Sequence, residues 1–278
     1  MKITKIFACA LAVLAVSGPA MSQDVYKVAL DGTFAPHAMP KLDGGVEGFN
    51  VDLAAALAEQ MGTKFELTAA QWSGLLPGMQ AGTYDFLVAP TTVTEERSEN
   101  MLFSEGYLNT DYQFVVKAGT DPVESLEGFK DKTIAVNKGS AYDKWARGLE
   151  SEIGWTVESY GTNTDAVQAV LSGRAFANVA GNTVSAWAVK QTPQLELSYL
   201  HSTGRVFAIP FPKASAELRV KVEGALECLK SSGKIAELSE KWFGVTPAAD
   251  SAAMTVYPGF GIPGMTGYDE TANTQSCS

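Results

Sequence analysis

The sequence contains few of the residues that most enzymes and nucleic-acid-binding proteins need. Its 278 residues include only 2 histidines and 3 cysteines, with no paired carboxylates, no cysteine–histidine arrangement and no cluster of metal ligands. Lysine and arginine total 21 against 31 acidic residues, a net charge of −10, which argues against nucleic acid as a partner. Beyond the N-terminus, no apolar stretch approaches the roughly 20 residues of a membrane-spanning helix. These absences predict a protein that is not an enzyme, holds no metal or cofactor and binds no nucleic acid.

The N-terminal segment has the layout of a cleaved secretory signal. Lys2 and Lys5 give it a positive start, an uncharged apolar run covers residues 6–16, and small residues precede a plausible cut before Gln23. The alternative, a membrane anchor, needs a longer apolar run. Cys9 lies inside the run instead of after it, which disfavours a lipoprotein. We therefore expect residues 1–22 to be removed and the mature protein to work in the periplasm.

Two cysteines, Cys228 and Cys277, remain once that segment is removed. In an oxidising compartment such a pair is expected to form a disulfide. The bridge would attach the C-terminal tail to the helix that carries Cys228. Two unrelated thiols are the alternative, because a sequence cannot test the geometry of a bridge.

The chain alternates strand-like and helix-like segments from residue 25 to residue 242. One amphipathic helix is predicted to start after Asn50 as its N-cap, because Leu53 and Leu57 repeat at a spacing of four before Gly62 ends it. Regular alternation of this kind predicts an α/β fold with a mostly parallel sheet. Ligands of such sheets bind at the carboxyl ends of strands, beside helix N-termini. After Gly244 the periodicity fades, which predicts a tail that wraps the protein or hangs free.

Two predicted helix N-termini carry polar side chains. Ser140 and Asp143 have the spacing of a capping box, and Thr94 caps a helix whose first turn contains Arg97. A cation in the first turn opposes the helix dipole. Arg97 is better placed there if its guanidinium reaches an anionic ligand, since it can clamp a carboxylate with two parallel hydrogen bonds. The alternative is an exposed arginine in a surface ion pair.

Eight short motifs follow one another between residues 25 and 245. They include Gly48-Phe49-Asn50-Val51-Asp52-Leu53-Ala54, Gly82-Thr83-Tyr84-Asp85, Thr92-Val93-Thr94-Glu95-Glu96-Arg97, Phe103-Ser104-Glu105-Gly106-Tyr107 and Lys241-Trp242-Phe243-Gly244. In type and order they resemble the extracellular solute-binding proteins of family 3, which serve polar amino-acid ABC importers.

This resemblance implies a two-lobe periplasmic-binding-protein fold of type II, with two hinge crossovers and the ligand in the interlobe cleft. Lobe 1 would take residues 24–112 and 207–246, lobe 2 residues 113–206, and the tail residues 247–278. The implied function is that of a monomeric periplasmic receptor that captures an amino acid or amino-acid-like small carboxylate by lobe closure. Its partner would be an ABC permease in the inner membrane. A sensor module for the same ligands is the alternative, and a dehydratase-like enzyme on this fold has less support.

The resemblance also assigns residues to the ligand's carboxylate. Arg97 would clamp it, and Thr92 and Ser140 would offer further contacts. The structural alternative for Thr92 and Ser140 is that they serve only as helix caps.

Three more residues are assigned to the remainder of the ligand. Phe34 and Trp72 match aromatic positions that sandwich the ligand's side chain, and Asp31 matches an acid at a strand end that reads its polar groups. Both aromatic residues could instead belong to the hydrophobic core.

One position departs from the family pattern. The acid that pairs with a ligand's α-ammonium in that family is replaced here by Gly181, followed by Asn182, and the resemblance still places both positions among the ligand-binding residues. An unpaired ammonium in a closed cleft would cost several kcal/mol. Either Asp31, Glu105 or another acid takes over this role, or the ligand has no free α-ammonium, as in an N-substituted amino acid or an organic acid.

Overall fold

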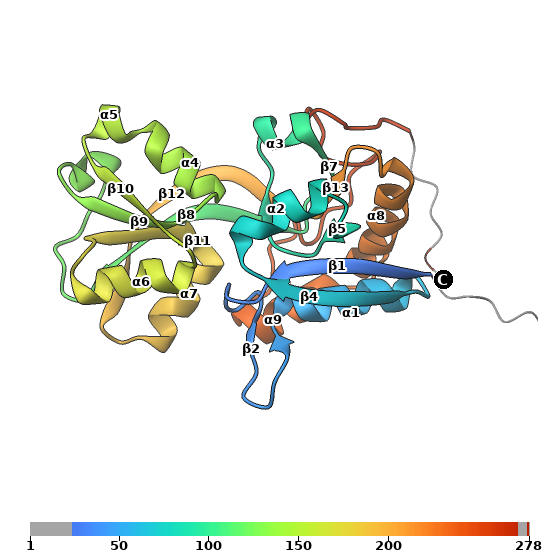
Figure 1. The fold of residues 1–278 in the computed structure, drawn as a ribbon, viewed down its shortest axis with the longest axis horizontal. Coiled ribbons are helices and arrows are strands. Elements are labelled where there is room, and N and C mark those ends of the chain that lie inside the picture. Colours follow the sequence, from blue (N-terminus) through green and yellow to red (C-terminus); the bar gives the residue numbers. More distant parts are fainter. Residues whose placement is uncertain (1–23, 272–276, 278) are drawn as a thin grey trace, which may run out of the picture.

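The computed structural model describes residues 24–271 and residue 277, and the predicted signal, residues 1–22, lies outside them. The described chain forms two α/β lobes that lie side by side and are joined by two long strands (Figure 1). The predicted fold class, two α/β lobes with two crossovers, is confirmed. Within the described residues, no helix combines the length and apolar character that crossing a bilayer requires.

The first lobe, lobe 1, is built on a three-stranded parallel sheet in the order β4-β1-β5. A large hydrophobic core lies between this sheet and the surrounding helices. Its elements are β1 (Val25–Asp31), α1 (Phe49–Gln60), β4 (Lys64–Ala70), α2 (Trp72–Gln80), β5 (Phe86–Leu87), α3 (Glu95–Asn100), α8 (Ala216–Ser231) and α9 (Lys234–Phe243), with the short pairs β2 (Met39–Pro40) with β3 (Val46–Glu47) and β7 (Met101–Phe103) with β13 (Pro210–Pro212).

Helix α1 shows how local sequence shapes this lobe. Leu53 and Leu57 are fully buried, as their spacing predicted. The predicted N-cap was wrong, because Gly48 and not Asn50 precedes the helix. Gly48 has a φ of 145°, and a Cβ there would lie 2.3 Å from the carbonyl oxygen of His37, so only glycine fits. Asn50 lies within the helix, with its amide oxygen 2.8 Å from Nδ1 of His37.

A six-stranded mixed sheet in the order β10-β9-β11-β8-β12-β6 forms the second lobe, lobe 2, and continues along β8 and β12 to β6, which pairs with the lobe 1 end of β12. Strand β9 runs parallel to β10 and β11, whereas β8 and β12 run antiparallel to their neighbours. Helix α7 was not predicted from the sequence. The elements of this sheet and its helices are β6 (Thr91–Thr92), β8 (Leu108–Lys117), η1 (Leu126–Phe129), β9 (Thr133–Asn137), α4 (Ala141–Gly148), α5 (Glu150–Ile153), β10 (Thr156–Tyr160), α6 (Asn163–Ser172), β11 (Ala177–Gly181), α7 (Asn182–Gln191) and β12 (Leu195–Ala208).

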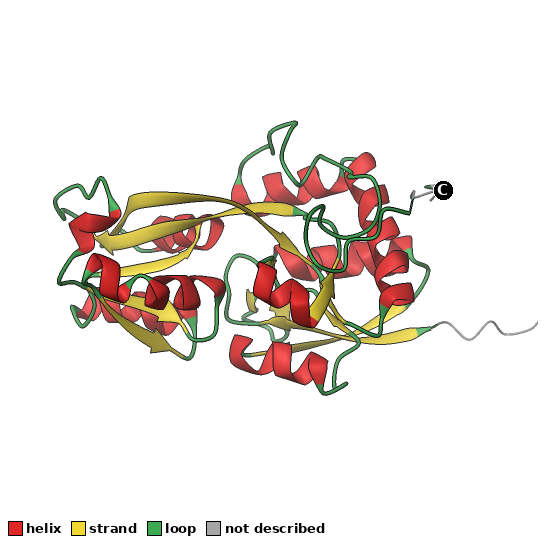
Figure 2. Cartoon of the chain, turned by 90° about the horizontal axis from the view of Figure 1, so that it is seen from above, coloured by secondary structure: helices red, strands yellow, loops and turns green. Residues whose placement is uncertain are grey.

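Strands β8 and β12 form the connection between the lobes, and Figure 2 shows them running from one lobe to the other. The lobe bounds inferred from the resemblance place the second crossover at residues 206–207, but β12 already begins at Leu195. Both proposed lobe boundaries, after residues 112 and 206, fall inside these continuous strands. The exact limits of the lobes therefore stay a proposal.

The C-terminal segment packs on lobe 1 instead of hanging free. Its buried residues include Ala252 and Phe260. The backbone N–H of Tyr257 donates to the Glu105 carboxylate at 2.8 Å, and a second backbone N–H, at residue 261, donates to the carboxylate of Glu223 at 2.6 Å. Through these bonds the segment up to residue 271 is part of the fold of lobe 1.

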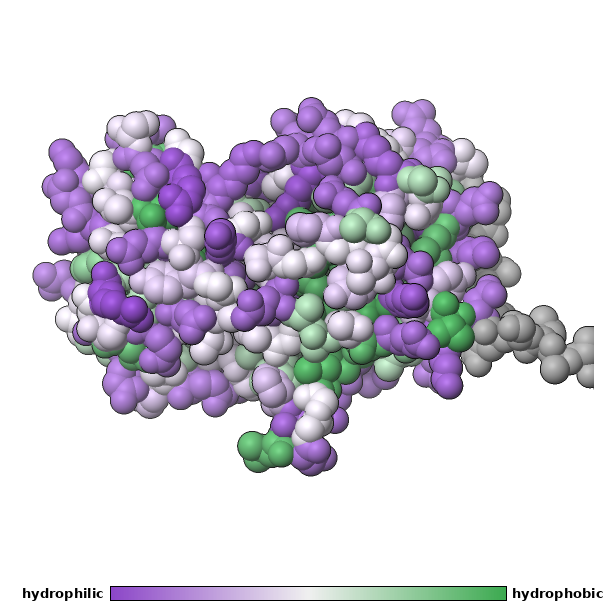
Figure 3. Space-filling model, in the orientation of Figure 1, coloured by the Kyte–Doolittle hydropathy of each residue, from purple (hydrophilic) through white to green (hydrophobic). Residues whose placement is uncertain are grey.

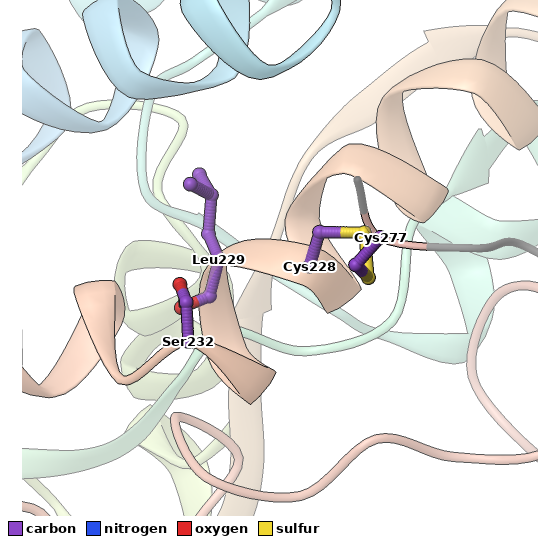
Figure 4. Close-up of a disulfide and its surroundings, with 4 residues drawn as sticks. All are labelled: Cys228, Leu229, Ser232 and Cys277. Carbon is purple, nitrogen blue, oxygen red and sulfur yellow. A yellow bond between two sulfur atoms is a disulfide. The ribbon is translucent and has the colours of Figure 1, made fainter.

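A disulfide links the end of the chain to α8. The structure joins Cys228 to Cys277 with an S–S distance of 2.02 Å, as the close-up in Figure 4 shows. The two cysteines are 49 positions apart, so the bridge closes a loop that includes α9 and the packed tail.

Candidate functional site: the interlobe cavity

A small cavity lies between the lobes, where the carboxyl ends of β1 and β9 meet the N-terminus of α4. Six of the eight predicted ligand-binding residues line it: Asp31, Phe34, Trp72, Thr92, Arg97 and Ser140. The sequence reasoning missed the other five residues of the lining, which are Pro90, Asn137, Ala141, Tyr142 and Phe207.

The lobes touch each other around this cavity, so the structure is a closed form. Nη2 of Arg97 in lobe 1 donates to the Gly139 carbonyl in lobe 2 at 3.3 Å. Nε2 of His37 lies 2.8 Å from Oγ1 of Thr183 in α7, and Lys144 pairs with Glu96 at the rim. The outer surface is hollowed between the lobes, as Figure 3 shows near the top of the view, where most of the visible side chains are polar.

Arg97 is a half-buried cation that has no anionic partner among the described residues. Its Nη1 donates to the Thr92 carbonyl at 2.8 Å, and its guanidinium lies 5.3 Å from the centroid of the Trp72 ring. It forms no ion pair with any residue that the structure describes. Burial lowers the pKa of the guanidinium from its ordinary value, which reports the cost of removing this charge from water. An anionic ligand would offset that cost.

The N-terminus of α4 gives the cavity a second feature that favours anions. The N–H of Asp143 donates to Ser140 Oγ at 3.0 Å, and the Asp143 carboxylate accepts the Gly139 N–H at 2.8 Å. This is the reciprocal capping that the sequence predicted. Ser140 and the first residues of the helix border the cavity, so the positive end of the helix dipole acts on it.

Asp31 is the acid of the cavity. Its side chain is 3% exposed, and its Oδ1 accepts the N–H of Thr33 at 2.9 Å and the hydroxyl of Thr33 at 2.7 Å. Burial raises the pKa of its carboxyl, against the opposing effect of these hydrogen bonds. Burial also raises the pKa of the Tyr142 phenol, and the Asp31 charge adds to that rise. Asp31 forms no ion pair with the described residues, so it can accept a ligand's cation.

Asn137 supplies an unused acceptor. It is 1% exposed and lines the cavity, and its Oδ1 has no hydrogen-bond partner among the described residues. Such a buried oxygen costs free energy unless a donor reaches it. Asn137 is the last residue of β9, and the rule that ligands bind at the carboxyl ends of strands could have identified it.

Two predicted ligand contacts lie outside the cavity lining. A Cβ on Gly181 would lie 3.2 Å from Cζ of Phe207, so the Phe207 ring fills the space beside that residue. Asn182 directs its amide oxygen to a backbone N–H of β8 at 3.4 Å. Glu105, which the sequence suggested as a substitute acid, forms an ion pair beneath the tail with an Oε1–Nζ distance of 2.6 Å, so it is not available to a ligand in the cleft.

Neither histidine lines the cavity. His37 is buried among aromatic rings and next to Asn50, and burial lowers the pKa of its imidazole to about 4. His201 stacks on Trp145 with ring centroids 4.9 Å apart. The cavity therefore contains matched charges and aromatic walls but no histidine for proton transfer.

Comparison with known proteins identifies the family that this chain matches. The family model for bacterial extracellular solute-binding proteins, family 3, matches residues 26–245, which confirms the resemblance found in the sequence. A curated relative, the L-arginine-binding protein of Pseudomonas aeruginosa, is 27% identical over 87% of this chain and 96% of its own length.

Solved structures agree with the sequence comparison. An ancestral arginine-binding protein bound to arginine has a TM-score of 0.75 at 33% identity, covering 79% of this chain and 98% of the other. An ancestral amino-acid-binding protein described as a precursor of cyclohexadienyl dehydratase has a TM-score of 0.73 at 29% identity, covering 79% and 95%. The type II two-lobe architecture is thereby confirmed.

Proposed function

Because the chain belongs to family 3 of the bacterial extracellular solute-binding proteins, we propose that it is the capture component of an ABC importer. We propose further that its ligand is an amino acid or an amino-acid-like small carboxylate. One observation carries this proposal: the unpaired guanidinium of Arg97 lies beside the N-terminus of α4 in a cavity that both lobes enclose. The names of its relatives, which include arginine-binding and cystine-binding proteins, support the same ligand class.

Lobe closure provides the binding mechanism. Lobe 1 presents Arg97 and Asp31, and lobe 2 presents the first turn of α4 and Asn137. A carboxylate held by the Arg97 fork would complete the anion site when α4 closes over it. Closure excludes water and strengthens these contacts because the local dielectric constant falls. A ligand that touches both lobes therefore favours the closed state over the open one.

The cellular setting follows from the same family membership. We propose that residues 1–22 are cleaved on export, that the mature chain works in the periplasm as a monomer, and that it delivers its ligand to a permease in the inner membrane. The family's extracellular members support this location.

We also propose that the protein is not an enzyme, although one structural neighbour is a precursor of a dehydratase. Asp31, Arg97 and Tyr142 are the ionisable side chains of the described lining. The Asp31 carboxylate accepts two hydrogen bonds from Thr33, and burial raises the pKa of the Tyr142 phenol further above neutral pH. No histidine of the described chain lines the cavity, and one cation faces one acid there, so this set suits binding better than acid–base catalysis.

Replacement of the cationic clamp tests the receptor proposal. Arg97→Ala should weaken ligand binding by about 3 kcal/mol, roughly a hundredfold in Kd, because it removes a charged, desolvated hydrogen-bonding partner. Calorimetry with a panel of amino acids and organic acids measures the loss. Arg174→Ala, at an exposed arginine of lobe 2, is the matched control and should bind normally. If the Arg97→Ala variant and the unaltered protein bound every ligand with equal affinity, the cavity would not be the ligand-binding site.

A further inference from the structure

We infer that the cavity accepts a zwitterion with a single carboxylate and a single cation, and that Phe207 denies space to a second cation. This inference deepens the proposed receptor function and rests on it. Among the described residues of the lining, Arg97 is the basic side chain and Asp31 the acidic one. Neither has a partner of opposite charge within the described protein. The charges that complete this site must come from the ligand.

The cavity limits how many charges its ligand can carry, because a charge buried without a partner of opposite sign is costly. One carboxylate pairs with Arg97, and one cation pairs with Asp31. Free arginine brings a guanidinium and an ammonium, so one of its cations would have no acid in the cavity. Glutamate brings a second carboxylate. Further charged side chains, among them Arg205, Glu95 and Glu96, lie outside the cavity in the outer groove, where Arg205 donates to the Tyr112 hydroxyl at 2.8 Å.

The space beside Gly181 is occupied by the ring of Phe207, an uncharged side chain. The Phe207 ring is 1% exposed, and its strand pairs with β6 through the register Phe207–Thr92. A Cβ on Gly181 would meet Cζ of Phe207 at 3.2 Å and Oγ1 of Thr110 at 3.4 Å. A side chain at position 181 would therefore press on the Phe207 ring, which would have to shift by a few tenths of an ångström to admit it. Phe207 is thus a specificity-determining residue.

Asn137 indicates which kind of cationic group the ligand carries. Its buried Oδ1 has no partner among the described residues and needs an N–H donor. Phe34 and Tyr142 give the remaining wall an aromatic character, which suits a cation or its attached carbons. The preferred cation is therefore an ammonium, or an N-substituted ammonium, that still carries N–H groups. A quaternary ammonium would leave Asn137 unsatisfied.

A binding panel on the unaltered protein tests the charge rule. Calorimetry at neutral pH would compare glutamine, proline, arginine, glutamate and glycine betaine. We expect glutamine or proline to bind at least about tenfold more tightly than arginine, glutamate and glycine betaine. Arginine or glutamate as the tightest ligand would overturn the charge rule, and glycine betaine as the tightest would overturn the role of Asn137.

Variants of the blocked subsite test the role of Phe207. Gly181→Asp alone should leave the ratio of arginine to glutamine affinity unchanged, because the ring still fills the space. The double variant Gly181→Asp with Phe207→Ala should raise this ratio at least about tenfold. A rise of that size in the single variant would refute the blocking role. Melting curves of each variant without ligand verify folding, and the panel on the unaltered protein decides the charge rule independently.

The two proposals fail in different ways. If arginine binds most tightly and its binding depends on Arg97, the receptor function stands and the single-cation rule is wrong. If Arg97→Ala leaves the binding of every panel compound unchanged, or if no compound binds the unaltered protein, the receptor proposal for this cavity is wrong. Asp31→Asn adds a direct check, because it should weaken glutamine binding at least about tenfold and leave the affinity for a keto acid nearly unchanged.

Discussion

His37 should make the stability of the protein depend on pH in an acidic window. Its imidazole is 1% exposed and is enclosed by aromatic rings, with Asn50 and Thr183 as neutral hydrogen-bond partners at 2.8 Å. Burial lowers the pKa of the ring from 6.5 to about 4. The unfolded chain therefore binds a proton between about pH 6.5 and 4 that the folded protein does not bind.

The size of the effect follows from the shift. Because the folded-state pKa is the lower one, the free energy of unfolding is unaffected by His37 above pH 6.5 and falls as the pH decreases toward 4. Each pKa unit corresponds to about 1.4 kcal/mol. The loss should reach about 2 kcal/mol at about pH 5 and about 3 kcal/mol near the lower end of the window.

The assay is urea denaturation followed by tryptophan fluorescence at about pH 7 and about pH 5. Carboxylates also titrate in this range, so the measured quantity is the difference in pH dependence between the unaltered protein and His37→Gln. That variant should lose about 2 kcal/mol less stability on acidification. His201→Gln, at a half-exposed histidine of β12, is the matched control and should change the pH dependence much less. An identical loss in the unaltered protein and in His37→Gln would show that the buried ring is not neutral.

Two further predictions concern lobe 1 and its tail. Burial raises the pKa of the Glu223 carboxyl from 4.5 to about 8, so the folded protein retains a proton that the unfolded chain releases. The free energy of unfolding should therefore fall as the pH rises through this window, and Glu223→Gln should remove that part of the slope in urea denaturation. Its amide oxygen can still accept both N–H bonds that now reach Oε1, and a slope equal to that of the unaltered protein would contradict the assignment. Cys277→Ser should lower the free energy of unfolding by up to about 4 kcal/mol, because the bridge closes a loop of about 49 residues in the unfolded chain. Melting curves with and without reductant measure this, and a melting temperature of the unaltered protein that does not respond to reductant would count against it.

The sequence predicted those parts of the site that depend on local chemistry. Thr94 and Ser140 cap their helices through bonds to the backbone N–H groups of Arg97 and Asp143, and such caps are encoded within four residues. A cation in a first turn conflicts with the helix dipole and drew attention to Arg97, but its assignment to the ligand came from the family resemblance. The assignment of Asp31 came from that resemblance alone.

The parts that were missed depend on contacts between distant segments. Phe207 reaches the cavity because β12 pairs with β6 across more than a hundred residues, and no local pattern reports that pairing. The cap of α1 was misassigned for a similar reason. Asn50 is a good N-cap by type, but its side chain bonds to His37, and the close approach of that residue's carbonyl requires glycine at position 48. Tertiary contact overrode local preference in both cases.

The C-terminal tail is the clearest example of such dependence. The family match ends at residue 245, and little periodicity follows in the sequence. Nevertheless, Lys230 and Glu105 form an ion pair with both side chains at most 1% exposed, and the tail supplies the Thr255 carbonyl to the ammonium at 2.8 Å and the Tyr257 N–H to the carboxylate. A buried ion pair is stable only when its remaining hydrogen-bonding groups are satisfied. The tail therefore satisfies part of the hydrogen bonding of the ion pair to which α8 contributes Lys230. The tail also donates the Ala252 N–H to a side chain of β8 at 2.9 Å, so it contacts one of the two strands that connect the lobes.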